Sequence, residues 1–123
     1  MIYALVGIGG ALGSITRFFC SRWLGLTVDG FPLGTLFVNW LGCLLIGICW
    51  GFFSADPKYT SMRLLLITGF LGGFTTFSSF GWESLQLFND GKWKLAVSYI
   101  LLSNVIGIFL VMLGLNLVLK LRV

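Results

Sequence analysis

Long apolar stretches with few charges, separated by short polar segments, dominate the pattern of the chain. The apolar stretches cover residues 2–26, 33–53, 64–88 and 95–119. Each is long enough for the roughly 20 helical residues that cross a hydrocarbon core of ~30 Å. Because backbone polar groups in lipid must pair within the protein, such stretches are expected to be helical. The pattern therefore predicts an all-α integral membrane protein with four transmembrane helices.

The connections between the apolar stretches are short and rich in turn-forming residues. Asp29-Gly30, Asp56-Pro57 and Asn89-Asp90-Gly91 are typical of tight turns. The first stretch has no basic residue before it, so we interpret it as a mature helix and not as a signal peptide. Residues 1–123 are therefore expected to form a single transmembrane domain.

The composition excludes several classes of protein. Hydrophobic residues make up 58% of the chain and charged residues 10%, with a mean hydropathy of +1.01, which lies outside the range of soluble domains. The net charge of +4 comes from isolated Lys and Arg near segment ends, so no nucleic-acid partner is expected. The chain has no histidine and no paired acidic residues, so we predict neither an enzyme nor an organic cofactor.

The basic residues are divided evenly between the two sides of a four-helix arrangement. One side would hold Lys58, Arg63, Lys120 and Arg122, and the other Arg17, Arg22, Lys92 and Lys94. The positive-inside rule then favours neither orientation. This balance suits a protein that inserts both ways and forms an antiparallel pair, although two arginines at membrane depth would remove the balance.

Glycines at four-residue spacing occur in three of the stretches, as in Gly9 and Gly13, or Gly47 and Gly51. In lipid, such spacings let helix backbones approach closely. For these two pairs we interpret the spacing as helix packing alone.

The run GFLGGFTTFSSF, from Gly69 to Phe80, differs from the other glycine pairs because it adds threonines and serines in the middle of a spanning stretch. We predict that the helix breaks there. Broken backbone at membrane depth is tolerated where it faces protein, water or an ion, and freed carbonyls can coordinate Na⁺. The alternative is a glycine-rich kink in which serine and threonine hydroxyls bond back to the helix.

Three motifs resemble those of the Fluc (CrcB-like) fluoride channels. GFLGGFTTFSSF resembles the signature of that family, and GALGSITRF, from Gly10 to Phe18, resembles its first-helix motif. Asn39 matches the asparagine of the second helix, and Tyr99 with Ser103 matches a polar track on the fourth. The motifs occur in the expected order, and the resemblance covers the whole chain.

The resemblance implies passive, selective fluoride conduction that lowers cytoplasmic fluoride, across a bacterial inner membrane. It also implies an antiparallel, dual-topology homodimer in membrane lipid with two ion pathways. One structural Na⁺ would lie at the dimer centre, held by the backbone carbonyls of Gly72 and Thr75 from both subunits. Phe77 and Phe80 would line the pores.

The chemistry of fluoride indicates further candidate residues. Fluoride is small and strongly hydrated, so it needs hydrogen-bond donors, and uncharged donors allow release. Phenylalanine ring edges, which are electropositive, can also face an anion. Arg17 and Glu83 are candidates for a pore mouth, or for residues that merely reach toward the membrane surface. The candidate donors are the Asn39 amide and the hydroxyls of Thr76, Ser78, Ser79, Tyr99 and Ser103.

Two other function classes remain. A proton-coupled small multidrug exporter is also a four-helix chain of this length, but it needs a carboxylate in the first helix, where this chain has Arg17 and no acid. A purely structural, holin-like assembly fits the composition but leaves the glycine, threonine and serine run unexplained.

Overall fold

The computed structural model of the chain describes residues 1–25, 29–53 and 56–122. The first two spans are the helices α1 (Ile2–Leu24) and α2 (Leu33–Phe53). The third span contains the 3₁₀ turn η1 (Pro57–Tyr59), α3 (Thr60–Arg63), the π-helical segment η2 (Leu64–Leu71), α4 (Gly72–Phe74) and α5 (Phe77–Asn89). The fourth contains α6 (Trp93–Leu101), the π-helical segment η3 (Leu102–Ile106) and α7 (Gly107–Leu121).

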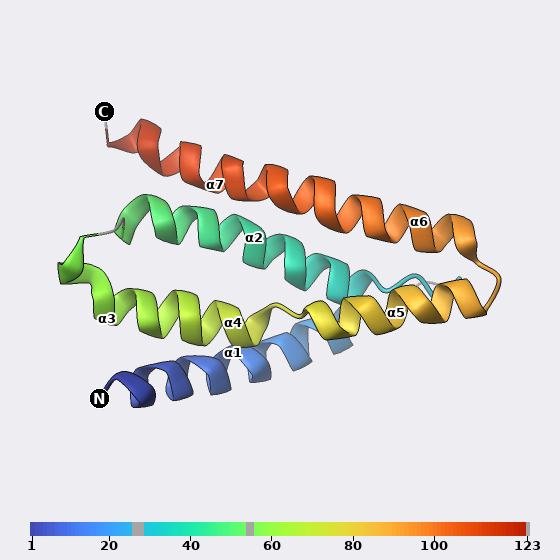
Figure 1. Cartoon of the computed structure of the whole chain (residues 1–123), viewed down its shortest axis with the longest axis horizontal. Coiled ribbons are helices and arrows are strands. Elements are labelled where there is room, and N and C mark those ends of the chain that lie inside the picture. The colour runs from blue at the N-terminus through green and yellow to red at the C-terminus, as the bar shows by residue number, and fades with distance from the viewer. Residues whose placement is uncertain (26–28, 54–55, 123) are drawn as a thin grey trace.

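The described residues contain four helices that are long and apolar enough to cross a membrane, which confirms the predicted number. The spans alternate in direction, so both termini lie at one end and the α5–α6 turn lies at the other (Figure 1). The third span begins at Pro57 rather than at residue 64, because Asp56 accepts a hydrogen bond from the Lys58 N–H and caps η1. The fourth covers Trp93–Leu121 rather than 95–119. The predicted end of the first helix, residue 26, lies outside the described residues.

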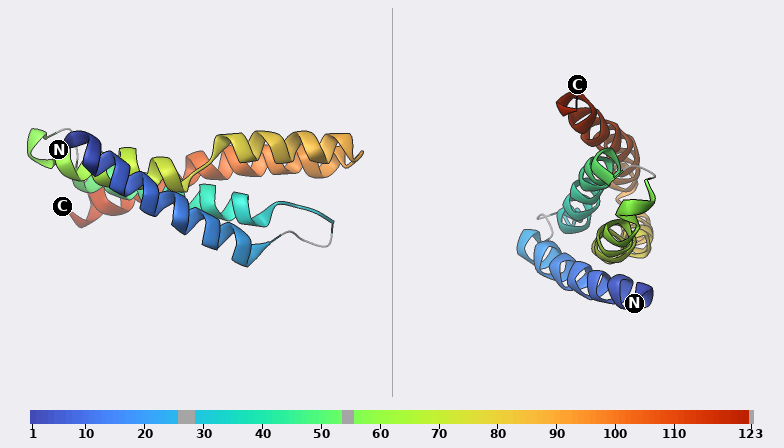
Figure 2. Two further views of the ribbon diagram at one scale, coloured as in Figure 1. Left: turned by 90° about the horizontal axis from the view of Figure 1, so that it is seen from below. Right: turned by 90° about the vertical axis from the view of Figure 1, so that its left-hand side faces the viewer.

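The spans pack in pairs, with α2 along α7 and α1 along η2 and α4 (Figure 2). Glycines make both contacts close. A Cβ atom at Gly13 would overlap the Phe70 carbonyl, and one at Gly47 or Gly114 would overlap a carbonyl of the facing helix. Glycine at these positions therefore lets backbones meet, as the four-residue spacings predict.

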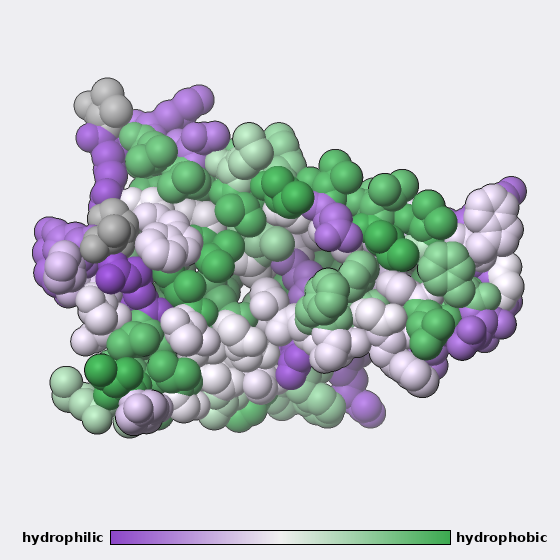
Figure 3. Space-filling model, in the orientation of Figure 1, coloured by the Kyte–Doolittle hydropathy of each residue, from purple (hydrophilic) through white to green (hydrophobic). Residues whose placement is uncertain are grey.

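Apolar side chains cover the outside of the bundle, and hydrophilic residues gather toward its two ends (Figure 3). Exposed large side chains include Phe19, Val105, Ile108 and Phe109. Such a surface is unstable in water and suits lipid or another subunit. Two small buried clusters lie inside, one around Leu36, Phe80, Leu87, Ala96 and Tyr99 and the other formed by Val38, Leu71 and Phe74.

Candidate functional site

The third span is interrupted at Thr75 and Thr76. Both have extended backbone angles, with φ −81° and ψ 157° at Thr75 and φ −148° and ψ 120° at Thr76. α4 therefore ends at Phe74 and α5 begins at Phe77, close to the middle of the span. The Thr76 hydroxyl oxygen accepts the Ser79 N–H at 3.2 Å and caps α5. The interruption lies within the glycine, threonine and serine run.

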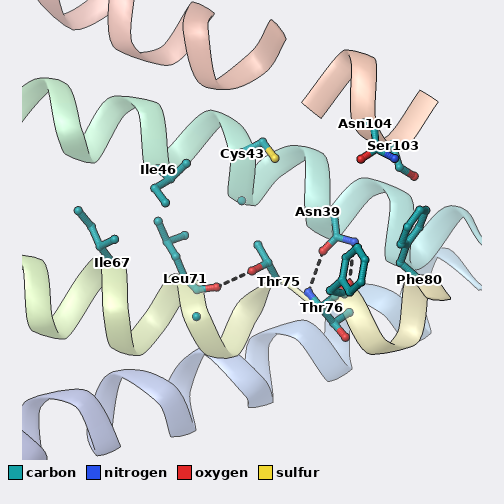
Figure 4. Close-up of a pocket in the computed structure, with 13 residues that line it drawn as sticks. Asn39, Cys43, Ile46, Ile67, Leu71, Thr75, Thr76, Phe80, Ser103 and Asn104 are labelled. Carbon is teal, nitrogen blue, oxygen red and sulfur yellow. Dashed lines mark hydrogen bonds between the residues drawn. The ribbon is translucent and has the colours of Figure 1, made fainter. Parts of the chain in front are cut away.

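Asn39 of α2 pairs with the backbone of Thr76 across this break (Figure 4). Its Oδ1 accepts the Thr76 N–H at 2.8 Å, and its Nδ2 donates to the Thr76 carbonyl at 3.0 Å. A carboxamide offers one acceptor and two donor hydrogens, so it satisfies both backbone groups of one residue. One Nδ2 hydrogen is therefore engaged with the backbone, and one remains for another acceptor.

The break interrupts the α-helical pairing of the backbone carbonyls of residues 72–75, including those of Gly72 and Thr75. In a continuous α-helix the Thr76 N–H would bond to the Gly72 carbonyl, and the Ser79 N–H to the Thr75 carbonyl. Here the first N–H goes to Asn39 and the second to the Thr76 hydroxyl. Carbonyl oxygens released in this way are the type of ligand that hard cations prefer.

A cavity of about 340 Å³, which we call the break cavity, opens beside the interruption. Most of its wall is apolar, as in the ligand sites of many proteins, with a few polar groups. The wall includes the predicted site residues Asn39, Thr75, Thr76, Phe77, Phe80 and Ser103 (Figure 4).

The hydroxyl of Ser103 in the break cavity differs from other helix hydroxyls. Ser84 and Thr75 donate to the carbonyl four residues before them, at 2.7 and 2.9 Å. The Ser103 oxygen is buried and has no hydrogen-bond partner among the described residues. Leaving a buried polar group unpaired costs about 1–3 kcal/mol. Because Ser103 lines the break cavity, its hydroxyl is a candidate donor to whatever occupies that space.

A second hollow, of about 600 Å³, is more polar, and we call it the polar hollow. Thr76 lines both the polar hollow and the break cavity, so the two spaces lie next to each other at the interruption. The other polar residues of the polar hollow are Ser14, Arg17, Ser21, Arg22, Thr35, Ser79 and Glu83.

The Glu83 carboxylate is held by two hydroxyls from other spans. Thr35 of α2 donates to Oε1 and Tyr99 of α6 donates to Oε2, both at 2.7 Å. Each carboxyl oxygen thus accepts one hydroxyl from another span. Thr35, which the sequence did not single out as a site residue, thus belongs to the site. The signal for it was its position four residues before Asn39 on one face of α2.

The predicted residues around the break differ in how far the single chain buries them. Phe80 is 9% exposed, with its ring centroid 5.2 Å from that of Tyr99, whereas Phe77 is 82% exposed. Tyr99 is fully buried and donates its hydroxyl hydrogen to Glu83. Ser78 is exposed. Phe77 thus borders the break cavity with most of its ring exposed on the single chain, and the hydroxyl of the exposed Ser78 lies 3.4 Å from that of Thr76.

Comparison with known proteins identifies the family. The profile of the family described as "CrcB-like protein, Camphor Resistance (CrcB)" matches residues 4–115. A protein of Methylobacillus flagellatus, named fluoride-specific ion channel FluC, is 47% identical over 117 residues, which are 93% of this chain and 91% of the relative. One of Parabacteroides distasonis with the same name is 43% identical over 111 residues, 89% of this chain and 87% of the relative. This family comprises ion channels and not enzymes. The chain belongs to the Fluc (CrcB-like) family.

Proposed function

We propose that the protein is a fluoride-selective channel that lets fluoride leave the cytoplasm passively through the bacterial inner membrane. The observation that supports this most is the interruption at Thr76, where the polar hollow and the break cavity lie next to each other in the middle of a span. The groups gathered there are mainly uncharged donors. The printed names of the relatives specify the same ion.

The break gives an anion a favourable electrostatic position. The amino-terminal end of a helix has unpaired N–H groups and a partial positive charge, and α5 begins at Phe77 inside the spanning region. The second Nδ2 hydrogen of Asn39 and the unpartnered Ser103 hydroxyl add donors in the break cavity. Neutral donors replace water around fluoride without binding it so tightly that it cannot leave.

The polar hollow supplies an entrance. Two arginines, Arg17 and Arg22, against one acidic residue favour anions in it, because an excess of basic side chains raises the local concentration of anions. Glu83 lines the same hollow, with both carboxylate oxygens engaged by Thr35 and Tyr99. These bonds hold the Glu83 side chain beside the entrance.

An antiparallel second subunit completes the proposed channel. Phe77 and Gly72 border the break cavity and are exposed on a single chain, so a partner would cover them. The equal numbers of basic residues at the two ends allow both orientations. We expect Phe77 and Phe80 to present their ring edges to the anion in this assembly.

A Na⁺ at the centre of the dimer fits the released carbonyls. Within residues 1–25, 29–53 and 56–122, no cluster of three His, Cys, Asp or Glu side chains offers a metal site. We propose the Gly72 and Thr75 carbonyls of both subunits as the ligands, because the N–H groups that would pair with them in a continuous helix bond elsewhere. The ion would neutralise the carboxyl-terminal end of α4 and hold the two breaks together.

Ion efflux from liposomes tests the function. Purified protein is reconstituted with potassium fluoride inside, and valinomycin sets an inside-negative potential, which contributes about 2.3 kcal/mol per 100 mV toward anion exit. We expect fluoride to leave without a proton gradient and chloride to stay. Fluoride that leaves only with an imposed proton gradient, or export of a cationic drug, would favour the exporter instead.

Biased insertion tests the antiparallel assembly. Two or three lysines added to the turn at residues 89–94 should fix one orientation and abolish fluoride efflux from cells. A partner fixed the other way should restore it. Full activity of one biased variant alone would exclude the antiparallel dimer.

A further inference from the structure

We propose that Asn39 is a positioning residue for the cation site, because it takes the N–H that would otherwise occupy the Gly72 carbonyl. The inference rests on the proposed Na⁺ at the dimer centre and assigns part of that site to a side chain that does not touch the ion. The geometry that supports it is the pairing of one carboxamide with both backbone groups of Thr76.

The Thr76 N–H has two possible acceptors, and only one of them leaves the Gly72 carbonyl free. In a continuous helix it would bond to Gly72, four residues earlier. In this structure it bonds to Asn39 Oδ1 at 2.8 Å. The second bond, from Nδ2 to the Thr76 carbonyl at 3.0 Å, fixes the carboxamide in the orientation that presents Oδ1 to the N–H. If this acceptor is lost, the Thr76 N–H can instead bond to the Gly72 carbonyl, which closes the helical turn.

The release of the Thr75 carbonyl is independent of Asn39. It depends on the Thr76 hydroxyl, which accepts the Ser79 N–H at 3.2 Å. Asn39 therefore controls one of the two carbonyls in each subunit, and its loss should weaken cation binding rather than alter every part of the break. Asn39 also lines the break cavity, so one side chain joins the cation site to the proposed ion pathway.

Two substitutions of Asn39 separate its role as acceptor from its role as donor. Asn39→Asp keeps an acceptor for the Thr76 N–H and loses the donor. Asn39→Leu loses both and is similar in size. Asn104→Leu is the matched control, because Asn104 lines the same cavity but donates to the Ile100 carbonyl of its own helix.

The readout is the sodium dependence of thermal unfolding, measured on the purified full-length dimer at constant ionic strength with choline replacing sodium. A cation bound only by the folded dimer raises the melting temperature as its concentration rises. We expect the wild type, Asn39→Asp and Asn104→Leu to show the rise. Asn39→Leu should need at least tenfold more sodium for the same rise, because the variant dimer loses one released carbonyl from each subunit.

The outcomes distinguish this inference from the proposal on which it rests. A wild type whose melting temperature ignores sodium would reject the cation site itself. A sodium response in Asn39→Leu equal to that of the wild type would overturn the role of Asn39 and leave the cation site standing. An equal loss in Asn39→Asp and Asn39→Leu would also overturn it, since the acceptor would not matter. If Asn39→Leu does not fold, Asn39→Ala, which also lacks the acceptor, takes its place with the same expected loss.

Discussion

The α2–α7 contact and the interrupted third span both depend on glycine, yet only the third span breaks. Gly47 and Gly114 bring α2 and α7 so close that either Cβ would overlap a facing carbonyl, and both helices stay continuous there. Gly69 of the third span also lies close to α1, where a Cβ atom would be 2.9 Å from the Val6 carbonyl oxygen, and η2 remains helical around it. The helix is interrupted only at Thr75 and Thr76.

The difference teaches that replacement hydrogen-bond partners, and not glycine, determine where this membrane helix breaks. Unpaired backbone groups at membrane depth are costly, so a break needs other partners for them. At Thr76 the Asn39 carboxamide and the Thr76 hydroxyl supply those partners. No such polar side chain from a neighbouring span bonds to the backbone at Gly47 or Gly114 among the described hydrogen bonds.

The largest expected effect lies in the continuous pair. In Gly114→Leu the new side chain would overlap the Leu44 carbonyl, and the packed backbone cannot move aside to make room for it. We expect a loss of stability on the order of 3 kcal/mol or more, or no folded protein. Met112→Leu, two residues away and exposed, is the control and should be neutral. Thermal unfolding after size-exclusion chromatography measures both, and a Gly114→Leu protein as stable as the wild type would contradict the packing described.

The next effect concerns ion flux at the break. Phe77→Ile and Phe80→Ile each remove a ring edge worth about 1 kcal/mol to an anion, so fluoride efflux should fall about fivefold or more. Phe109→Ile on the exposed face of α7 should leave efflux unchanged. Phe74→Ile is unsuitable as a control, because Phe74 is 1% exposed and packs against Val38 and Leu71. Dimeric Phe77 and Phe80 variants with normal efflux would remove both rings from the pathway.

A smaller effect is expected from the cap of α5. Thr76→Val removes the acceptor of the Ser79 N–H and should cost about 1 kcal/mol of stability, whereas Thr76→Ser should restore it. The matched control is Thr16→Val, whose hydroxyl bonds to the Leu12 carbonyl of its own unbroken helix. Chemical or thermal unfolding compares the three. If Thr16→Val and Thr76→Val cost the same, the cap would have no special role in the break.

The smallest expected effect is at Trp40, which follows Asn39 on α2. Its Nε1–H donates at 3.1 Å to the Leu102 carbonyl in η3, next to Ser103. Trp40→Phe keeps an aromatic ring and loses this bond, so Ser103 should be less well placed and efflux should fall about fivefold at most. The effect should disappear in a Ser103→Ala background. Trp93→Phe, at the exposed start of α6, is the control. If the losses of efflux add up in the variant that combines Trp40→Phe with Ser103→Ala, Trp40 does not act through Ser103.

The sequence was sufficient for the parts of the molecule that depend on local pattern. Apolar length predicts the four spans, and the run from Gly69 to Phe80 predicts where the third is interrupted. Four-residue glycine spacing predicts the close contacts of α1 and α2. These features depend on residues close together in the chain, so their pattern is visible without the fold.

The parts that depend on contacts between spans could not be derived in this way. Tyr99 was expected to offer its hydroxyl to the ion, but the structure places it against Glu83, from a different span. Asn39 was expected to offer its amide to the ion, and one of its two amide hydrogens bonds to Thr76 instead. The π-helical segments η2 and η3 were also not anticipated, because a single added residue per turn hardly changes the apolar pattern.

The reversal potential of the current in a planar bilayer tests the central claim most directly. With potassium fluoride in unequal concentrations on the two sides and equal chloride, a fluoride-selective passive channel should reverse at the equilibrium potential of fluoride. The value should not move when a pH gradient is added, because no proton is carried with the ion. A reversal at the potassium or chloride potential, or one that follows the pH gradient, would contradict the account.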